Sequence, residues 1–319
     1  MYERMYGFDK PPFANIPDPA FLYPSPQHQR AISILQYALM ARAGFCVITG
    51  DIGAGKTTLV RGVLQNLDMP IEAGLVSNTQ CESFEELLRW ILLAFDLDYQ
   101  NKDKVQMYDD FVQYLVQQYQ AGRPVTLIID EAQNLSLELL EQLRMLSNVN
   151  TEKGQILQTI LVGQPELWDL LRDPAMIQFA QRISYDYFLR PLEDIETVQH
   201  YIEHRIATAG SDRQVFHPDC YPLITRATRG VPRLINLLCD SALIYAYGED
   251  LEQVPAKIVE RVIEDKQASF APIVAPAPPE PTKEKRSRAT DASSESASKK
   301  HKKMSLIEKA AERRLQNKA

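Results

Sequence analysis

The sequence predicts an α/β fold, with a parallel sheet sandwiched between helices, followed by a small all-helical domain and a disordered tail. Three observations lead to this prediction. Short apolar runs alternate with segments of helical periodicity as far as residue 191, a pattern typical of a parallel sheet with covering helices. Only helical periodicity continues from there to residue 270. The remaining residues are rich in proline, lysine and serine, a composition that buries little apolar surface.

These changes in pattern divide the chain into four expected parts. The parts are an aromatic and proline-rich segment (1–25), the nucleotide-binding α/β domain (26–191), a helical lid domain (192–270) and a proline-rich linker with a basic tail (271–319). Proline and aromatic side chains in the first part are typical of an ordered loop held by packing. Proline in the last part favours an extended linker.

The elements follow from the period of the apolar residues. Strands, apolar and rich in β-branched residues, are expected at 45–49, 73–77, 125–129, 157–162 and 185–189. Helices, with apolar residues three and four apart, are expected at 27–43, 83–95, 107–121, 194–209, 218–228, 232–247 and 255–268. The five strands would form the sheet, and the last four helices would form the lid domain.

Composition and cysteine usage indicate a cytoplasmic protein. Apolar residues make up 45% of the chain, which is ordinary for a globular protein. No apolar run approaches the roughly 18 residues that cross a bilayer, and the N-terminus has no export signal. The four cysteines are scattered without a C-x-x-C pair, which favours reduced thiols over a zinc site.

Charge is distributed unevenly along the chain. Residues 272–319 carry 12 lysines and arginines against 6 acidic residues, a balance of +6, which leaves −13 for residues 1–271 out of the overall −7. An acidic body with a basic tail suggests that the tail is the part that meets polyanions.

A glycine-rich stretch between the first strand and the next helix carries the strongest functional signal. It matches the phosphate-loop pattern G-x-x-x-x-G-K-[ST] in the context of strand, turn and helix. The predicted nucleotide-binding residues are Gly50, Asp51, Ile52, Gly53, Ala54, Gly55, Lys56, Thr57 and Thr58. In such a loop the lysine reaches the β- and γ-phosphates and the first threonine is a ligand for Mg²⁺. The stretch therefore predicts binding of ATP or GTP with Mg²⁺.

Two carboxylates follow the strand at 125–129, at the edge of the sheet where ligands of open α/β folds bind. Asp130 is the expected second ligand of Mg²⁺, and Glu131 is the expected general base that activates water. An apolar run followed by Asp-Glu is often only the start of a helix. Here the catalytic interpretation is favoured, since the pair lies about 75 residues after Lys56 on the next strand but one.

Three further polar residues have two interpretations each. Gln164 follows the strand at 157–162, where it either senses the γ-phosphate or caps the next helix. Arg182 precedes the last strand, where it either reaches a neighbouring subunit's nucleotide or forms a surface ion pair. Arg233 opens a helix after Pro232, from which it can swing over the phosphates, although an exposed arginine at a helix start is the commoner case. Spacing alone decides none of the three.

The chain resembles AAA+ ATPases and, more narrowly, the ATPase domain of general secretion pathway protein A, the ExeA type. The resemblance covers about residues 1–268. It rests on Met1-Tyr2, Phe8, Pro12-Phe13, Pro17 to Pro19, Phe21 to Tyr23, Gly50 to Thr58, Asp130 to Gln133, Val162 to Leu167, Gln181 to Ile183 and Gly230 to Asn236.

The resemblance implies roles for the three undecided residues. Gln164 corresponds to sensor 1, Arg182 to an arginine finger acting in trans, and Arg233 to sensor 2. An arginine finger in trans implies a homo-oligomer, and the family implies ATP with Mg²⁺ as ligands. The family also typically continues into a membrane span and a periplasmic module, neither of which this sequence contains, so a partner protein at the inner membrane is expected.

Two functions from different classes follow. The favoured one is an oligomeric ATP-hydrolysing motor that supports assembly of a secretion or pilus-type envelope machine through a partner protein. The alternative is an ATP-dependent DNA-binding regulator related to transposition ATPases, against which the acidic body argues, since DNA affinity comes largely from basic side chains. A nucleotide-gated scaffold is disfavoured by Glu131. Weak contact with DNA or a membrane surface is assigned to Lys299, Lys300, Lys302 and Lys303, which equally suit a solvated tail.

Overall fold

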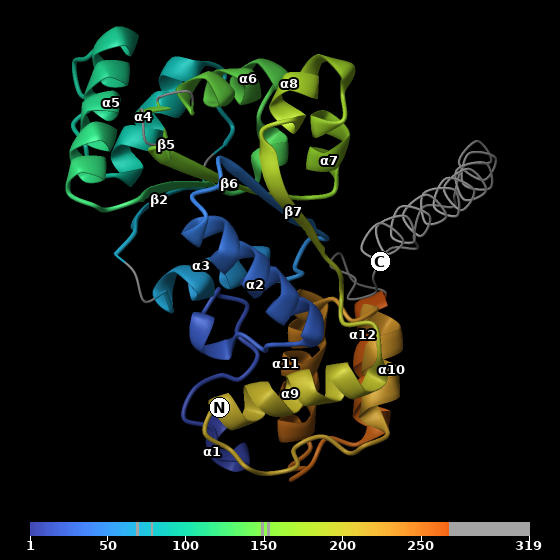
Figure 1. The fold of residues 1–319 in the computed structure, drawn as a ribbon. Helices are drawn as coiled ribbons and strands as arrows, with labels where there is room; N and C mark the ends of the chain where they lie inside the picture. Colours follow the sequence, from blue (N-terminus) through green and yellow to red (C-terminus); the bar gives the residue numbers. More distant parts are fainter. Residues whose placement is uncertain (68–69, 78, 148–149, 152–153, 268–319) are drawn as a thin grey trace, which may run out of the picture. The chain divides into compact units, whose positions relative to one another are not determined.

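A five-stranded parallel sheet lies at the centre of the part of the chain that precedes α9 (Ile195–Thr208). The computed structural model describes residues 1–67, 70–77, 79–147, 150–151 and 154–267, and Figure 1 shows the course of the chain. The strands are β1 (Phe45–Gly50), β2 (Glu72–Val76), β3 (Val125–Ile129), β6 (Leu157–Gly163) and β7 (Ile183–Leu189). They lie in the order β2-β3-β6-β1-β7, every neighbouring pair parallel. The predicted fold class is confirmed.

Burial of the strands follows their place in the sheet. Every residue of β1, β3 and β6 is buried, whereas the edge strands β2 and β7 contain exposed positions. Continuous apolar runs are typical of parallel strands covered on both faces. The same property made these strands recognisable from the sequence.

Helices cover both faces of the sheet (Figure 1). Alternate residues of β1 divide between the two faces: Cys46 and Ile48 pack with one group of helices, Phe45 and Val47 with the other. The first group contains α2 (Pro26–Met40) and α3 (Lys56–Gln65). The second group contains α4 (Phe84–Ala94), α5 (Lys104–Gln120), α6 (Leu137–Leu146), α7 (Glu166–Leu171) and α8 (Ile177–Ala180).

Side-chain caps fix where several of these helices begin. Ser83 Oγ accepts a hydrogen bond from the backbone N–H of Glu86 at the start of α4. At the start of α5, Asp103 and Gln106 form a reciprocal capping box. Such caps satisfy backbone donors that have no partner inside the helix. The local sequence therefore determines these helix starts.

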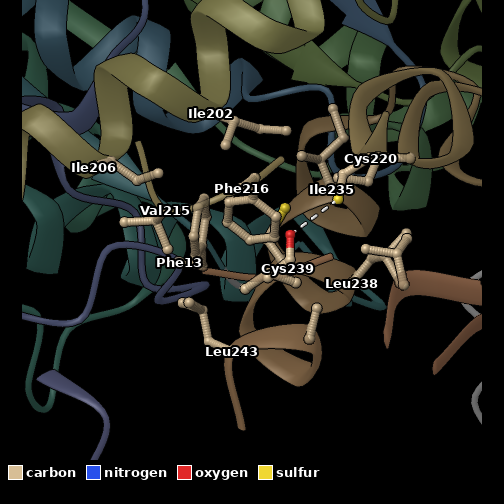
Figure 2. Packing of buried hydrophobic residues seen from close by; sticks show 14 of the residues in the cluster. Phe13, Ile202, Ile206, Val215, Phe216, Cys220, Ile235, Leu238, Cys239 and Leu243 are labelled. Carbon is tan, nitrogen blue, oxygen red and sulfur yellow. Dashed lines mark hydrogen bonds between the residues drawn. The ribbon is translucent and has the colours of Figure 1, made fainter. Parts of the chain in front are cut away.

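Four helices follow the sheet in the chain, and we call them the helical domain. They are α9 (Ile195–Thr208), α10 (Cys220–Thr228), α11 (Pro232–Gly248) and α12 (Ala256–Gln267). Figure 2 shows part of their core, in which Phe13 from the N-terminal segment lies against Phe216 of the helical domain. The ring centroids of these two residues are 6.1 Å apart in an edge-to-face arrangement.

The N-terminal segment packs into the helical domain along much of its length. It contains α1 (Glu3–Tyr6) and a 3-10 turn, η1 (Pro19–Phe21). Its buried aromatic residues, which share one apolar cluster with the four helices, are Tyr2, Tyr6, Phe8, Phe13 and Phe21. Buried Arg205 of α9 donates to the carbonyl oxygens of Pro12 (2.6 Å) and Ala14 (3.1 Å). These contacts tie the start of the chain to a domain that follows it by about 190 residues.

Some elements were not anticipated from the sequence. Among the shortest of these are the strand pair β4 (Asn150–Thr151) and β5 (Gly154–Gln155), and the 3-10 turns η2 (Ala132–Asn134) and η3 (Pro174–Met176). Each has at most three residues, too few for a periodic pattern. The helices of the described residues are too short or too polar to span a bilayer. The expected linker and basic tail, with the four lysines assigned to polyanion contact, lie outside the described residues.

Candidate nucleotide-binding and catalytic site

The glycine-rich loop joins the end of β1 to the start of α3, as the pattern required. Its three glycines all have positive φ, and Gly53 (+80°) and Gly55 (+95°) lie in a backbone region that residues other than glycine rarely adopt. Gly55 is the residue that precedes α3. The loop therefore ends at the positive end of a helix, where backbone N–H groups bind anions.

Lys56 has the environment expected of a phosphate-binding lysine. Its side chain is 7% exposed, and its Nζ donates to the carbonyl oxygens of Gly50 (2.7 Å) and Asp51 (3.0 Å). Burial lowers the pKa of Lys56, while nearby carboxylates, Glu131 first, work to raise it. No carboxylate of the described chain forms an ion pair with it. A buried cation without an ion-pair partner fits an anionic ligand.

Two side-chain oxygen atoms, one from a threonine and one from an aspartate, meet beside the loop. Thr57 Oγ1 donates to Asp130 Oδ2 at 2.7 Å, joining α3 to the residue that follows β3. Asp130 is 8% exposed, and its backbone N–H donates to the carbonyl oxygen of Val76 in β2. A hydroxyl and a carboxylate are hard oxygen donors of the kind that Mg²⁺ prefers, and Mg²⁺ characteristically completes its shell with water and phosphate. The donor set therefore fits Mg²⁺ held jointly with a nucleotide.

Glu131 is held in a specific orientation at the end of β3. Its backbone is left-handed, with φ +52°, which is uncommon for a residue other than glycine and frequent at functional sites. Its Oε2 accepts hydrogen bonds from Gln164 Nε2 (3.0 Å) and Gln133 Nε2 (2.5 Å). Burial works to raise the pKa of Glu131, but the two amides and the charge of Lys56 together hold that pKa below its usual value. The carboxylate is therefore ionised at neutral pH.

Arg233 approaches the loop from the helical domain. The backbone N–H of Arg233, at the start of α11, donates to the carbonyl oxygen of Gly53 at 3.2 Å. A Cβ on Gly53 would lie 2.5 Å from Arg233 Cβ, so only glycine fits there. The arginine side chain is exposed and lines the cavity above the loop. The helical domain thus contacts the loop directly.

A cavity of about 240 Å³ lies between the loop, the N-terminal segment and the helical domain. Lys56, Thr57, Glu131, Gln164 and Arg233 all line it. Its other walls, which the sequence analysis missed, include residues 14–18 of the N-terminal segment, His28 of α2, and Tyr201, Arg205 and Asn236 of the helical domain. These residues come from segments far apart in the chain, and no motif links them.

His28 contacts the phosphate loop from the first turn of α2. Its Nδ1 lies 2.7 Å from Oγ of Ser25, the fully buried residue that caps this helix. Its Nε2 faces Gly55, where a Cβ would come within 3.6 Å. Burial lowers the pKa of His28, with a backbone hydrogen bond to Ala54 opposing that effect. A serine followed three residues later by a histidine at a helix start is the only local signal that could have pointed to this contact.

Arg182 lies apart from the other predicted site residues. It immediately precedes β7, whose first residue, Ile183, pairs with Phe45 at the start of β1. The phosphate loop follows the carboxyl end of β1. Arg182 therefore lies where the parallel strands begin, at the opposite end of the strands from the loop. It does not line the cavity of its own chain.

Comparison with known proteins agrees with this architecture. Residues 39–171 match the family described as AAA domain. The ORC2 protein of Aeropyrum pernix, in its ADPNP–ADP complexes, superposes with a TM-score of 0.64 and 17% identity, covering 81% of this chain and 72% of that one. Cdc6p from Pyrobaculum aerophilum gives a TM-score of 0.63 at 14% identity, covering 80% and 70%. At such identities the likeness concerns the fold alone.

The fold and the site together define an ATPase of the AAA+ class. A curated relative narrows the class: general secretion pathway protein A of Aeromonas hydrophila is 37% identical over 255 residues, which cover 80% of this chain. The chain belongs to the family of that protein. It spans about half of the relative's length, 46%.

Proposed function

We propose that this chain binds ATP with Mg²⁺ and hydrolyses it as an oligomeric AAA+ motor. The observation that carries the proposal is that buried Lys56, Thr57 and the oriented Glu131 line one cavity, with Asp130 hydrogen-bonded to Thr57 beside it. A protein that only binds nucleotide has no need of the glutamate. The site residues predicted from the sequence divide naturally among the steps of hydrolysis.

The binding residues act first. The loop backbone and Lys56 bind the phosphates, exchanging the lysine's contacts with Gly50 and Asp51 for phosphate oxygens. Thr57 and Asp130 hold Mg²⁺, which neutralises charge on the β- and γ-phosphates. Arg233 contacts the phosphates from the helical domain, so that nucleotide binding is linked to the position of that domain.

The hydrolytic residues act on water. Glu131, ionised and oriented, accepts a proton from the attacking water molecule. Gln164 turns its amide from the carboxylate to the γ-phosphate, the role of a sensor. Both residues lie at the carboxyl ends of adjacent strands, β3 and β6, so they share one edge of the sheet.

Oligomerisation is proposed because one expected residue is missing from the cavity. Arg182 lies at the opposite end of the strands from the loop, where it is suited to complete the site of a neighbouring subunit. Such an arginine stabilises the charge that develops on the transferred phosphate. The chain alone would therefore hydrolyse ATP slowly.

The cellular role is proposed from the relationship to general secretion pathway protein A. We propose that the motor supports assembly of a secretion or pilus-type envelope machine, from the cytoplasmic face of the inner membrane and through a partner protein. The domain boundaries at 25, 191 and 270 belong to the same proposal: nucleotide binding in the second part and a movable lid in the third.

The test is the steady-state ATPase rate as a function of protein concentration, with and without duplex DNA at physiological salt. A rate per subunit that rises with protein concentration and is the same with and without DNA supports the self-assembling motor. Clear stimulation of the ATPase rate by DNA would instead support the alternative function, an ATP-dependent DNA-binding regulator. Glu131→Gln is the matched control, expected to bind ATP normally but turn it over slowly; a wild-type rate in that variant would exclude Glu131 as the base.

A further inference from the structure

Gln133 links two of the proposed catalytic residues. It lies in the 3-10 turn η2, two residues after Glu131, and its side chain is partly buried. Its Nε2 donates to Glu131 Oε2 at 2.5 Å, and its Oε1 accepts from the backbone N–H of Gln164 at 3.0 Å. A carboxylate only accepts and an N–H only donates, so the two partners fix which way the amide points. One side chain thus spans the ends of β3 and β6.

The surroundings of Gln133 leave room for this bridge. A Cβ on Gly163 would come within 3.0 Å of Gln133 Oε1 and 2.8 Å of Leu167 Cδ2. A larger residue at 163 would therefore displace the amide. The left-handed backbone of Glu131 places Gln133 on the same side as the carboxylate, since both belong to one tight turn.

The two oxygens of Glu131 differ in their contacts. Oε2 accepts from both amides, whereas Oε1 accepts no hydrogen bond from the described part of the chain. If the side chain of Gln164 turns to a phosphate, Oε2 keeps Gln133 as its donor. Gln133 is itself held by the backbone N–H of Gln164, a hydrogen bond that does not involve the Gln164 side chain.

We propose that Gln133 is a positioning residue for ATP hydrolysis, which holds the Glu131 carboxylate in place through Oε2 while Oε1 faces the water. This inference rests on the proposed ATPase activity and deepens it. A different role would be merely structural, with Gln133 stabilising the turn after β3. The two roles differ in what they do to kcat, to nucleotide binding and to the Glu131→Gln variant.

The experiment compares Gln133→Met with Asn134→Ala. Methionine has nearly the size of glutamine but lacks both hydrogen-bonding groups. Asn134 lies in the same turn and donates to Thr79 Oγ1, which itself donates to the backbone carbonyl oxygen of Glu131, so Asn134 supports the turn without contacting the carboxylate. We expect Gln133→Met to lower kcat by about 10- to 100-fold, the order of loss caused by misplacing a catalytic group by an ångström. KM for ATP, the Kd for ADP and the melting temperature should stay near wild type, and Asn134→Ala should leave all four unchanged.

A double variant tests whether Gln133 acts through Glu131. In single-turnover measurements, Gln133→Met combined with Glu131→Gln should be no slower than Glu131→Gln alone, because the carboxylate being positioned is already gone. Gln133→Ala is measured alongside, so that one poorly folded variant does not decide the result. An unchanged kcat, a loss of ADP binding that parallels the loss of rate, or additive effects in the double variant would each overturn the inference. A wild-type protein without any ATPase activity would instead refute the proposed function.

Discussion

The backbone N–H of Arg233 donates to the carbonyl oxygen of Gly53, at 3.2 Å, so the first turn of α11 rests directly on the phosphate loop. The two residues are 180 positions apart in the sequence. Through this contact, any change in loop conformation on nucleotide binding acts on the start of a helix in the helical domain. The contact is thus a direct route from the phosphate loop to the part of the protein that we propose to move.

Gly53→Ala should separate this contact from ordinary backbone strain. Alanine adds a Cβ that would lie 2.5 Å from Arg233 Cβ, and it also makes the positive φ unfavourable. Gly122→Ala is a matched control, since φ there is +73° but nothing lies within 4 Å of an added Cβ. Gly122→Ala should lower the free energy of unfolding by about 1 kcal/mol through the positive φ alone, and Gly53→Ala should lower it further because of the added clash. Only Gly53→Ala should weaken ATP binding, by about tenfold or more, in a fluorescent-nucleotide titration; equal affinities in the two variants would argue against the contact.

Lys56→Ala should abolish measurable ATP binding while the protein stays folded. Hydrogen bonds to charged groups contribute about 1.5–3 kcal/mol each, so losing the lysine's contacts with phosphate should weaken binding by about 100-fold or more. Isothermal titration calorimetry with ATP and Mg²⁺ measures the effect. Lys257→Ala, at an exposed position on α12, is the control. Unchanged ATP affinity in Lys56→Ala would refute the loop assignment.

Arg182→Ala should bind ATP with wild-type affinity but hydrolyse it about 10³-fold more slowly, the order attributed to arginine fingers. Because the arginine is proposed to act in trans, mixing Arg182→Ala with Lys56→Ala should restore part of the activity: each mixed interface can combine an intact loop with an intact arginine. The rate of the mixture against the rates of the separate variants is the measurement. Absence of rescue would point to a monomer or to an arginine acting within its own chain.

Arg205→Met should destabilise the protein by about 3 kcal/mol in urea unfolding. The buried guanidinium donates to the carbonyl oxygens of Pro12 and Ala14, which would lose a charged partner. Arg213→Met is the matched control, because Arg213 also donates to a carbonyl oxygen of the N-terminal segment, that of Met5, but at an exposed position. Its effect should stay within about 0.5 kcal/mol. Similar losses of unfolding free energy in the two variants would mean that the burial of Arg205 does not strengthen its contribution to stability.

His28 should make the protein less stable in mild acid. Since burial lowers its pKa in the folded state, the unfolded chain takes up the proton first. The free energy of unfolding should therefore fall as the pH drops below about 6.5, the ordinary histidine value, by at most about 1.4 kcal/mol per pH unit for one group. His28→Gln should reduce this slope in urea unfolding between pH 7 and 5, and His200→Gln, at an exposed position of α9, should leave it unchanged. Equal slopes in all three proteins would contradict the expectation.

The sequence by itself determined the features that depend on neighbouring residues. Gly53, Gly55, Lys56 and Thr57 are close enough in the chain for their spacing to define the loop. Continuous apolar runs marked the central strands, which are covered on both faces of the sheet. Asp130 and Glu131 were found in the same way, because they follow such a run directly. Local backbone preferences and burial on both faces of the sheet each produce a pattern of residue types that can be recognised in the sequence.

Only the tertiary structure decided which remote segments complete the site. It brings Gln164 to Glu131, inserts Gln133 between them, rests Arg233 on Gly53 and closes the cavity with residues 14–18. It also buries the N-terminal aromatic residues among helices that come about 190 residues later. These contacts arise from the packing of elements that are distant in the chain. The free energy of that packing depends on the shapes of the elements and their positions in space. Contacting residues therefore have no fixed spacing in the sequence by which they could be recognised.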